Sequence, residues 1–280
     1  MSTYNAPAKL NLALLVSEPS SNGLHPLESL VQTIEWLDVI EFEEADEDSL
    51  VVDGAEIEPE ENFVNRALVA LRERWAVPSL GIRLEKHIPA EAGLGGGSSD
   101  AAATLVAASE IGRLPVDTPA AVAPSIGSDV PLFLTGGTVM VSGFGEVVES
   151  QPALEGFAVA VVVPEYRLGT ADVYRRWDEM EGPIGETVPS TLLPPLLREG
   201  IPIRNDLTPA ATALEPALAD FMADLRAAWG TVVVMTGSGS ACFGFFPDLD
   251  EAQDAARSVE SVCRGVVGAA LRRKGVERID

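Results

Sequence analysis

The stretch from residue 89 to residue 102 reads Pro-Ala-Glu-Ala-Gly-Leu-Gly-Gly-Gly-Ser-Ser-Asp-Ala-Ala, with four glycines in the five positions 93–97. The apolar residues before it alternate as in a half-buried strand, at Ile82, Leu84 and Ile88. The apolar residues after it share one face of a helix, at Ala102, Leu105, Val106 and Ile111. The predicted order is therefore strand, glycine loop, helix.

This order is typical of a phosphate-binding site. The start of a helix has backbone N–H groups without partners and a partial positive charge, so it stabilises an anion. Glycines allow φ > 0 and let a phosphate approach the backbone closely. Ser98 and Ser99 can cap the helix, or turn a hydroxyl toward a phosphate or its metal ion. The alternative is a flexible loop in front of a capped helix, without a ligand.

The glycine loop differs from two common nucleotide motifs. No lysine precedes the serines as in a Walker A loop. Ser99 and Asp100 also stand where a dinucleotide-binding fingerprint needs further glycine spacing. On its own, the loop predicts binding of a phosphate group, such as that of a nucleotide.

The composition is that of a folded protein with one large domain or two ordinary ones, because 46% of the 280 residues are hydrophobic and 22% are charged. No apolar run is long enough to span a bilayer, and the N-terminus lacks the pattern of a signal peptide. Cys242 and Cys263 lie far apart and form no CxxC motif, which argues against a zinc site or a disulfide framework. We therefore expect a cytoplasmic protein.

The net charge of −24 argues against partners such as nucleic acid or an anionic membrane, which bind basic patches. The chain has only three lysines, Lys9, Lys86 and Lys274. We expect a small polyanionic ligand to be bound mainly by backbone amides, a metal ion and one or two of these lysines. The protein is expected to be a monomer or a homodimer.

The rest of the chain alternates predicted strands and helices. Before the glycine loop we expect a strand at 6–16, paired strands at 39–44 and 49–52, and a helix at 62–75 with Asn62 as its N-cap. After it we expect a helix at 119–126, a hairpin at 138–148, strands at 157–163, 231–235 and 242–246, helices at 170–180 and 248–262, two helices ending near 229, and an apolar segment at 265–271. This order predicts an α+β or mixed α/β fold in two lobes.

In the first predicted strand, Lys9 and Asn11 lie two residues apart and so share one face. Their side chains are thereby aimed at the same place, which would suit a ligand. The alternative is an exposed lysine on an edge strand.

Three stretches resemble the signature motifs of the GHMP small-molecule kinases. They read Pro-Ala-Lys-Leu-Asn-Leu at 7–12, Gly-Leu-Gly-Gly-Gly-Ser-Ser-Asp-Ala-Ala at 93–102, and Thr-Gly-Ser-Gly-Ser-Ala-Cys at 236–242. The resemblance implies a two-lobed fold with the active site in the cleft. Its N-terminal ATP-binding lobe, at 1–152, would have a fold like that of a ribosomal protein, and its C-terminal substrate lobe, at 153–280, a ferredoxin-like fold.

With Gly-Ser-Asp-Val-Pro-Leu-Phe at 127–133, these motifs are similar to one branch of that family. Enzymes of this branch use ATP and Mg²⁺ to phosphorylate the 2-hydroxyl of a cytidine-diphosphate-linked methylerythritol, on the non-mevalonate route to isoprenoid precursors. The resemblance implies that Asp129 and Lys9 flank the acceptor hydroxyl. Asp129 would orient or deprotonate it, and Lys9 would keep Asp129 ionised and offset developing charge. For Asp129, the alternative is a turn or a helix cap.

The resemblance also implies ligand contacts for the remaining motif residues. ATP would be bound by Asn62, Pro89, Gly93, Leu94, Gly95, Gly96, Gly97, Ser98 and Ser99, with Ser99 also a candidate ligand of Mg²⁺. The acceptor would be bound by Asn11, Leu24, His25, Thr170, Tyr174, Gly237, Ser238 and Gly239. His25 would hydrogen-bond cytosine and Tyr174 would stack on it, whereas Leu24 replaces the tyrosine usual in this branch. The turn at 236–240 could instead be a plain tight hairpin.

Two other functions remain open from the sequence. One is a kinase of the same family for a smaller alcohol, such as homoserine or mevalonate. The triple-glycine loop and the Gly-Ser-Asp-Val-Pro stretch argue against it. The other is a non-catalytic nucleotide- or sugar-binding protein on the same fold, which would be expected to lack Lys9 or Asp129, and both are present.

Overall fold

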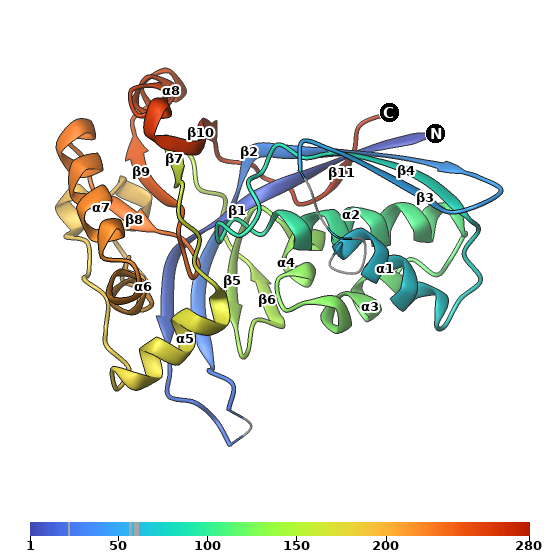
Figure 1. Cartoon of the computed structure of the whole chain (residues 1–280), viewed down its shortest axis with the longest axis horizontal. Coiled ribbons are helices and arrows are strands. Elements are labelled where there is room, and N and C mark those ends of the chain that lie inside the picture. Colours follow the sequence, from blue (N-terminus) through green and yellow to red (C-terminus); the bar gives the residue numbers. More distant parts are fainter. Residues whose placement is uncertain (22, 56–57, 59–61) are drawn as a thin grey trace.

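The computed structural model describes residues 1–21, 23–55, 58 and 62–280, and two β-sheets lie side by side in it (Figure 1). The larger sheet has the order β11-β1-β2-β4-β3, and β5 and β6 extend it from β2. Its strands are β1 Ser2–Val16, β2 Leu27–Glu44, β3 Ser49–Asp53, β4 Leu80–Glu85, β5 Thr138–Ser142, β6 Val147–Ser150 and β11 Glu277–Arg278. The smaller sheet has the order β10-β7-β9-β8. Its strands are β7 Ala158–Pro164, β8 Val233–Met235, β9 Cys242–Phe246 and β10 Cys263–Ala270.

Strand β1 connects the two halves of the molecule. It pairs antiparallel with β2, with register shifts after Pro7 and after Asn11. Its apolar residues enter three successive cores, because Tyr4 packs under the larger sheet, Leu10 between the sheets, and Leu14 among the helices of the second half. Lys9 and Asn11 on its other face are buried too, at 5% and 7% exposure. The predicted strand is confirmed, and it is not an exposed edge strand at these residues.

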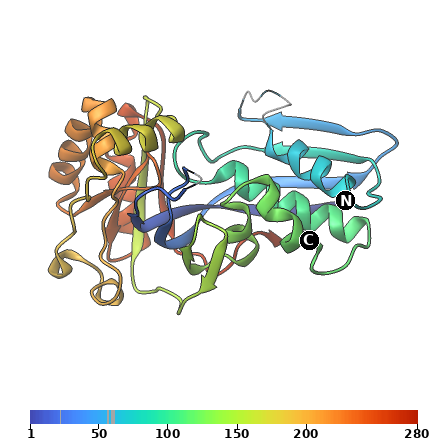
Figure 2. The same cartoon turned by 90° about the horizontal axis from the view of Figure 1, so that it is seen from below.

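Four helices cover one face of the larger sheet (Figures 1 and 2). They are α1 Phe63–Arg72, α2 Gly96–Ile111, α3 Thr118–Ile126 and α4 Val130–Thr135. Helix α2 packs against β1 and β2 as well as against the other three helices. Its alanines are fully buried, and their small side chains allow the close packing that surrounds α2 on several sides. The glycine loop therefore leads into a helix that is held at the centre of this half.

The smaller sheet is buried on both faces. Successive residues of β7 point alternately to the two sides, so Val159, Val161 and Val163 pack toward β1 and the glycine loop. The opposite face of β7 packs against helices. These are α5 Thr170–Glu179, α6 Thr208–Leu214, α7 Pro216–Trp229 and α8 Leu249–Arg257. Short 3₁₀ turns lie at Ser190–Leu192, Pro195–Leu197 and Glu260–Val262. The continuous apolar strand predicted at 157–163 is thereby confirmed.

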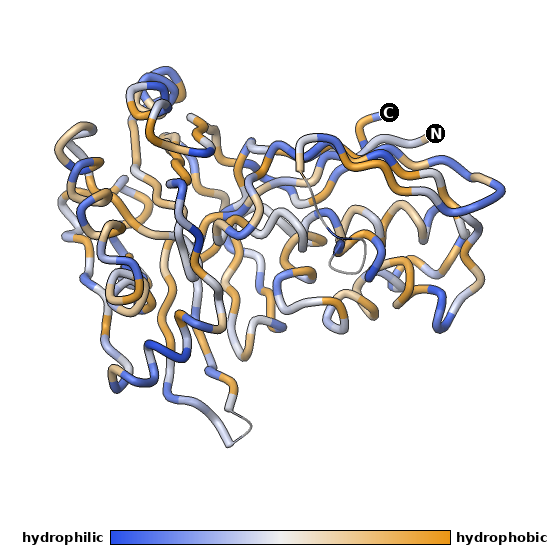
Figure 3. The backbone as a smooth tube through the Cα atoms, viewed as in Figure 1, coloured by the Kyte–Doolittle hydropathy of each residue, from blue (hydrophilic) through white to orange (hydrophobic). Residues whose placement is uncertain are grey.

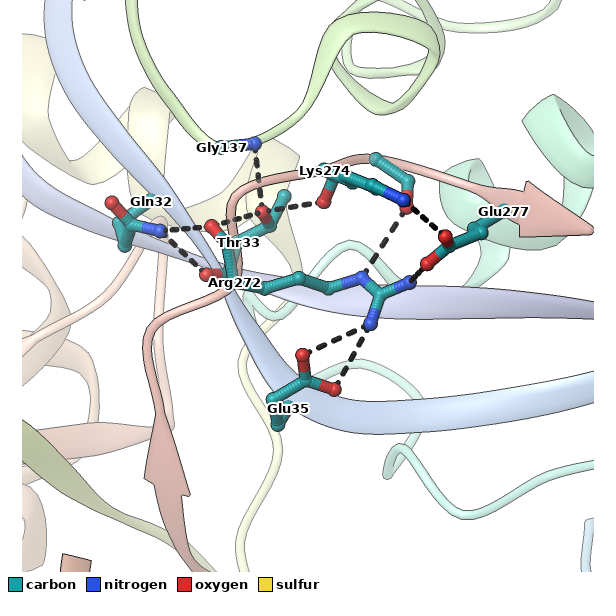
Figure 4. Close-up of polar contacts among 8 residues, drawn as sticks. Gln32, Thr33, Glu35, Gly137, Arg272, Lys274 and Glu277 are labelled. Carbon is teal, nitrogen blue, oxygen red and sulfur yellow. Dashed lines mark hydrogen bonds and ion pairs between the residues drawn. The ribbon is translucent and has the colours of Figure 1, made fainter. Parts of the chain in front are cut away.

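The last residues of the chain return to the larger sheet (Figure 4). Arg272 is 7% exposed, and its guanidinium binds both carboxylate oxygens of Glu35 at 3.0 Å and Glu277 at 2.7 Å. Thr33 of β2 accepts a hydrogen bond from the Arg272 backbone N–H and donates one to the carbonyl of Lys274. Val276 N–H donates to the carbonyl of Phe133 on α4. The C-terminal segment thus fastens α4 to β2.

Two sequence predictions on local structure need correction. Residues 39–44 and 49–52 are strands, but they do not pair with each other, because β4 lies between them. Asp48 accounts for the position of β3 beside β4, since its carboxylate accepts from the backbone N–H of Leu80 at the start of β4 and pairs with Arg72. Figure 3 shows the turn at 45–48, between β2 and β3, as hydrophilic and far from the smaller sheet. The helix predicted at 248–262 ends at Arg257, and a 3₁₀ turn follows.

The lobe boundary predicted at residue 152 falls between β6 and β7, and it stays a prediction. The part of the chain that the structure describes contains no helix long and apolar enough to cross a membrane.

Candidate active site

The glycine loop turns into α2 with backbone angles that favour glycine. Gly93 and Gly95 have φ values of 77° and 73°, and Gly95 is the N-cap of α2. A Cβ atom on Gly95 would lie 2.7 Å from the Phe133 ring and 3.1 Å from Cγ of Lys9. These glycines bring the backbone close to the side chains around it, and the first turn of α2 begins directly at the loop. The predicted strand–loop–helix order is confirmed.

The two serines do not cap the helix, in contrast to the prediction that they can. The cap is Gly95, which has no side chain, and the serines fall within the first turn, where Ser99 N–H already donates to the carbonyl of Gly95. Ser99 is fully buried, and among the described residues its hydroxyl has no hydrogen-bond partner. Ser98 is partly exposed. Of the two hydroxyls, that of Ser98 is therefore the more accessible to a ligand.

The second glycine turn packs directly against the first. A Cβ atom on Gly93 would lie 2.5 Å from the carbonyl oxygen of Thr236, and one on Gly237 would lie 3.1 Å from the carbonyl oxygen of Gly93. Ala241 N–H donates to the carbonyl of Ala92 at 3.2 Å. The motifs at 93–102 and 236–242, far apart in sequence, thus form one continuous backbone surface. Beside it, the hydroxyls of Ser238 and Thr170 lie 2.9 Å apart.

Lys9 lies between these turns and Asp129. Its backbone N–H donates to the carbonyl of Leu94, and its Nζ lies 3.6 Å from Oδ2 of Asp129. The side chain of Lys9 is 6% exposed, whereas that of Asp129 is 42% exposed. Asp129 stands at the N-cap position of α4 without capping it through its side chain. A buried cation therefore holds one edge of a carboxylate that is open to a ligand.

Asn11 fixes the position of Lys9. Its Oδ1 accepts from Nζ of Lys9 at 2.5 Å, and its Nδ2 donates to the hydroxyl of Ser29 at 2.8 Å. The backbone N–H of Asn11 donates to the hydroxyl of Thr236 at 2.8 Å. Both ends of the Asn11 amide are thus engaged within the protein, and the residue links the lysine to the second glycine turn.

The residues predicted for cytosine lie together at the tip of the β1–β2 hairpin and on α5. The His25 ring lies 5.3 Å from the Tyr174 ring and 5.3 Å from the Trp177 ring, measured between centroids. Its Nδ1 lies 3.1 Å from the carbonyl of Ser17, and its Nε2 lies 3.3 Å from Asp178. Burial, and then the charge of Asp129, raise the pKa of Tyr174 to about 12. Leu24 is 54% exposed.

The remaining predicted ATP contacts have structural roles as well. Asn62 caps α1 by accepting from Val64 N–H at 2.9 Å, as predicted, and its Nδ2 has no partner within the described part of the chain. Pro89 packs closely on Gly265 of β10. Leu94 is buried in the core between the two sheets. Gly97 faces the Phe63 ring.

Sequence reasoning missed Asn205, which holds the second glycine turn in place. Its Nδ2 donates to the carbonyls of Met235 and Gly237, both at 2.8 Å, and its Oδ1 accepts from Leu207 N–H. The residue is buried at 3% exposure and lies beside Leu14 of β1. The only signal in the sequence was an Asn-Asp pair ahead of a helix, which predicts a cap rather than a support for a distant loop.

A group of three or more His, Cys, Asp or Glu side chains that could hold a metal ion does not occur among the described residues. This arrangement still fits Mg²⁺ that arrives with a nucleotide. Such an ion takes most of its ligands from phosphates and water and needs only one or two protein oxygens. The Ser98 hydroxyl, which is partly exposed, is an oxygen donor of the kind it prefers.

The chain is similar to known proteins over most of its length. The family model described as "GHMP kinases N terminal domain" matches residues 62–137, and "GHMP kinases C terminal" matches residues 193–265. A protein of Sinorhizobium medicae named 4-diphosphocytidyl-2-C-methyl-D-erythritol kinase is 36% identical, with 92% of this chain and 91% of the relative covered. One of Paramagnetospirillum magneticum with the same name is 37% identical, with 91% and 92% covered.

The chain is also similar to solved structures. A crystal structure of 4-(cytidine 5'-diphospho)-2C-methyl-D-erythritol kinase is similar with a TM-score of 0.78 and 33% identity, over 96% of this chain and 98% of that one. A homoserine kinase from Cytophaga hutchinsonii is similar with a TM-score of 0.67 at 15% identity, over 99% and 97% of the two chains. At this lower identity, the second likeness is one of fold alone.

Proposed function

The chain belongs to the GHMP kinase family, and we propose that it transfers the γ-phosphoryl group of ATP to the 2-hydroxyl of 4-diphosphocytidyl-2-C-methyl-D-erythritol. The names of the relatives and of the similar crystal structure support this reaction. The structural observation that carries the proposal is the Lys9–Asp129 pair, which lies beside the joined glycine turns.

The glycine loop and the first turn of α2 would bind the phosphates of ATP. Backbone N–H groups at a helix start favour an anion, and the protein's strong negative charge makes such local donors necessary. Ser98 would add a hydroxyl, and Asn62 would lie at the adenine. Mg²⁺, held by the phosphates with Ser98, would neutralise charge on the β- and γ-phosphates. Ser99 would become a metal ligand only if its buried hydroxyl turned outward.

Asp129 would accept the proton of the acceptor hydroxyl. The oxygen then attacks the γ-phosphorus, the bond from that phosphorus to the β-phosphate oxygen breaks, and ADP leaves. Lys9, immobilised by Asn11, would stabilise the ionised carboxylate and the charge that develops on the transferred group. Because this transition state is loose, positioning of these groups supplies much of the acceleration.

The acceptor would extend from Asp129 toward α5. Tyr174 would stack on the cytosine with Leu24 on the other side, and His25 would hydrogen-bond it once its Nε2 exchanges Asp178 for the base. Gly237, Ser238, Gly239 and Thr170 would contact the diphosphate or the polyol, and Asn11 would act mainly through Lys9. A monomeric or homodimeric state and a cytoplasmic location complete the proposal.

The test is ATP consumption by the purified protein with 4-diphosphocytidyl-2-C-methyl-D-erythritol, in parallel with homoserine, mevalonate and galactose. We expect turnover on the cytidyl substrate alone, and its loss when EDTA removes Mg²⁺. Lys9→Ala should abolish turnover, whereas Lys274→Ala, a change at an exposed lysine away from the glycine turns, should not. Turnover on a smaller alcohol only would overturn the substrate assignment. ATP binding without turnover on any of them would favour a binding protein.

A further inference from the structure

A buried cluster of three charged side chains lies behind the glycine loop. Lys86 directly follows β4, and its Nζ lies 2.5 Å from Oδ2 of Asp38 on β2 and 2.7 Å from Oδ2 of Asp100 on α2. Their side chains are between 0% and 4% exposed. Burying charged groups costs free energy unless they are paired and hydrogen-bonded, so we looked for a role of this cluster in the fold or in ligand binding.

Asp38 ties the entrance of the glycine loop to the larger sheet. While its Oδ2 binds Lys86, its Oδ1 accepts from the backbone N–H groups of His87 and Ile88, at 2.6 Å and 2.9 Å. These two residues lead from β4 into the loop. The direction in which the chain leaves the sheet is therefore fixed by one carboxylate.

Asp100 ties the exit of the loop to the same point. It lies in the first turns of α2, which begins at Gly96, and it binds the ammonium of Lys86. A Cβ atom on Gly96 would lie only 3.2 Å from Nζ of Lys86. The ammonium is thus directly behind the first residue of the helix, and it joins the entrance of the loop, through Asp38, to its exit, through Asp100.

The ammonium of Lys86 is stabilised by the two carboxyl groups beside it. Burial alone would lower the pKa of Lys86, but the two carboxylates outweigh burial and raise it, so the side chain remains an ammonium. The other oxygen of Asp100, Oδ1, has no partner among the described residues, so Lys86 is the contact that orients this carboxyl.

We propose that Lys86 is a positioning residue for ATP: by bridging Asp38 and Asp100 it holds the two ends of the glycine loop at the spacing that the phosphates require. The inference rests on the proposed function, since it takes this loop as the phosphate site. The proposal predicts that loss of Lys86 affects ATP more than the cytidyl substrate. Loss of the bridge should weaken ATP binding and slow transfer, but leave the binding of the cytidyl substrate, which lies beyond Asp129, nearly unchanged.

The test compares kcat and the KM of each substrate in matched variants. Lys86→Met removes the bridge but leaves two carboxyls without a cation, so it is paired with the triple variant Lys86→Met, Asp38→Asn, Asp100→Asn, which removes that repulsion. The Asn at position 38 can still accept from His87 and Ile88. Lys274→Met is the control for loss of a lysine ion pair elsewhere. Melting temperature is measured for each.

In the variants that melt near the wild-type temperature, we expect the KM for ATP to rise about tenfold or more, a lower kcat, and a KM for the cytidyl substrate within about twofold. The control should match the wild type. An unchanged KM for ATP, or an equal rise of both KM values, would overturn the proposal. If the Lys86 variants fail to fold, Asp100→Leu, which removes the acceptor on α2, decides alone by the same comparison. If the wild type fails to turn over the cytidyl substrate, the proposed function fails, and the Kd of a fluorescent ATP analogue tests Lys86 by the same pattern.

Discussion

Gly95 lies against both Lys9 and Phe133, and replacing it with alanine tests how closely the groups around Asp129 are packed. Its φ of 73° places it in the left-handed region, where a side chain costs about 1–2 kcal/mol. The new Cβ would also lie 2.7 Å from the Phe133 ring and 3.1 Å from Cγ of Lys9, and overpacking of this kind costs about 1–3 kcal/mol. We expect the free energy of unfolding to fall by about 2–5 kcal/mol.

The effect of Gly95→Ala on kcat depends on which side chains the new methyl group displaces. Phe133 lies on α4, which begins next to Asp129, and Lys9 carries the ammonium that faces Asp129. Relief of the clash therefore displaces one or both members of the pair. Misplacement of reacting groups by about 1 Å can cost roughly 10²-fold in rate, so we expect kcat to fall by about that factor.

Two glycines provide matched controls. Gly230 also has a positive φ, of 63°, but among the described residues no atom beyond its chain neighbours lies within 4 Å of its added Cβ, so Gly230→Ala should cost about 1–2 kcal/mol in stability and leave kcat unchanged. Gly97 is helical, and its Cβ would lie 3.3 Å from the Phe63 ring, so Gly97→Ala tests a milder contact in the same loop. Urea unfolding and ADP release are the assays. A Gly95→Ala enzyme with the kcat of the wild type would refute the reasoning.

Further predictions concern residues outside the motifs. Asn205→Ala should cost about 1–3 kcal/mol in urea unfolding, because two buried carbonyls lose their donor, and should raise the KM of both substrates; unaltered KM values would contradict its support of the second glycine turn. Arg272→Met should lower the melting temperature and expose the C-terminal residues to limited proteolysis, because Glu35 and Glu277 lose their shared partner (Figure 4). Burial outweighs the opposing effect of the Lys86 ammonium and raises the pKa of Asp100 to about 7 from its ordinary value near 4, so between these pH values the folded protein keeps a proton that the unfolded chain releases. The stability of the wild type therefore falls as the pH rises from about 4 to 7. The unfolding free energy of Asp100→Asn minus that of the wild type should rise over that interval, and a constant value would contradict the shift.

Local patterns predicted the elements well because they depend on neighbouring residues. The glycine run at 93–97, the Asn62 cap and the apolar strand at β7 all form as expected. The pairing of β3 with β4 was not accessible, since it depends on Asp48 binding a backbone N–H 32 residues further along the chain. Alternation alone does not say which strand is the partner.

The same limit applies to the site. The motifs identified Lys9 and Asp129, and the structure brings them within 3.6 Å of each other. Lys9 is held by Asn11, whose backbone N–H donates to the hydroxyl of Thr236, and the turn that carries Thr236 is held in turn by Asn205, from a distant part of the sequence. Ser98 and Ser99 were equivalent in the sequence, and only the packing of α2 shows that one is buried and the other partly exposed.

In the proposed reaction, Asp129 acts on the acceptor hydroxyl, and the glycine loop binds ATP independently of Asp129. The most direct measurement is kcat of Asp129→Asn with the cytidyl substrate, together with the Kd of an ATP analogue. We predict a fall in kcat of about 10²–10⁴-fold, as for loss of a general base, with a Kd within about twofold of the wild type. An Asp129→Asn enzyme that keeps its kcat would show that the Lys9–Asp129 pair is not the site of the reaction.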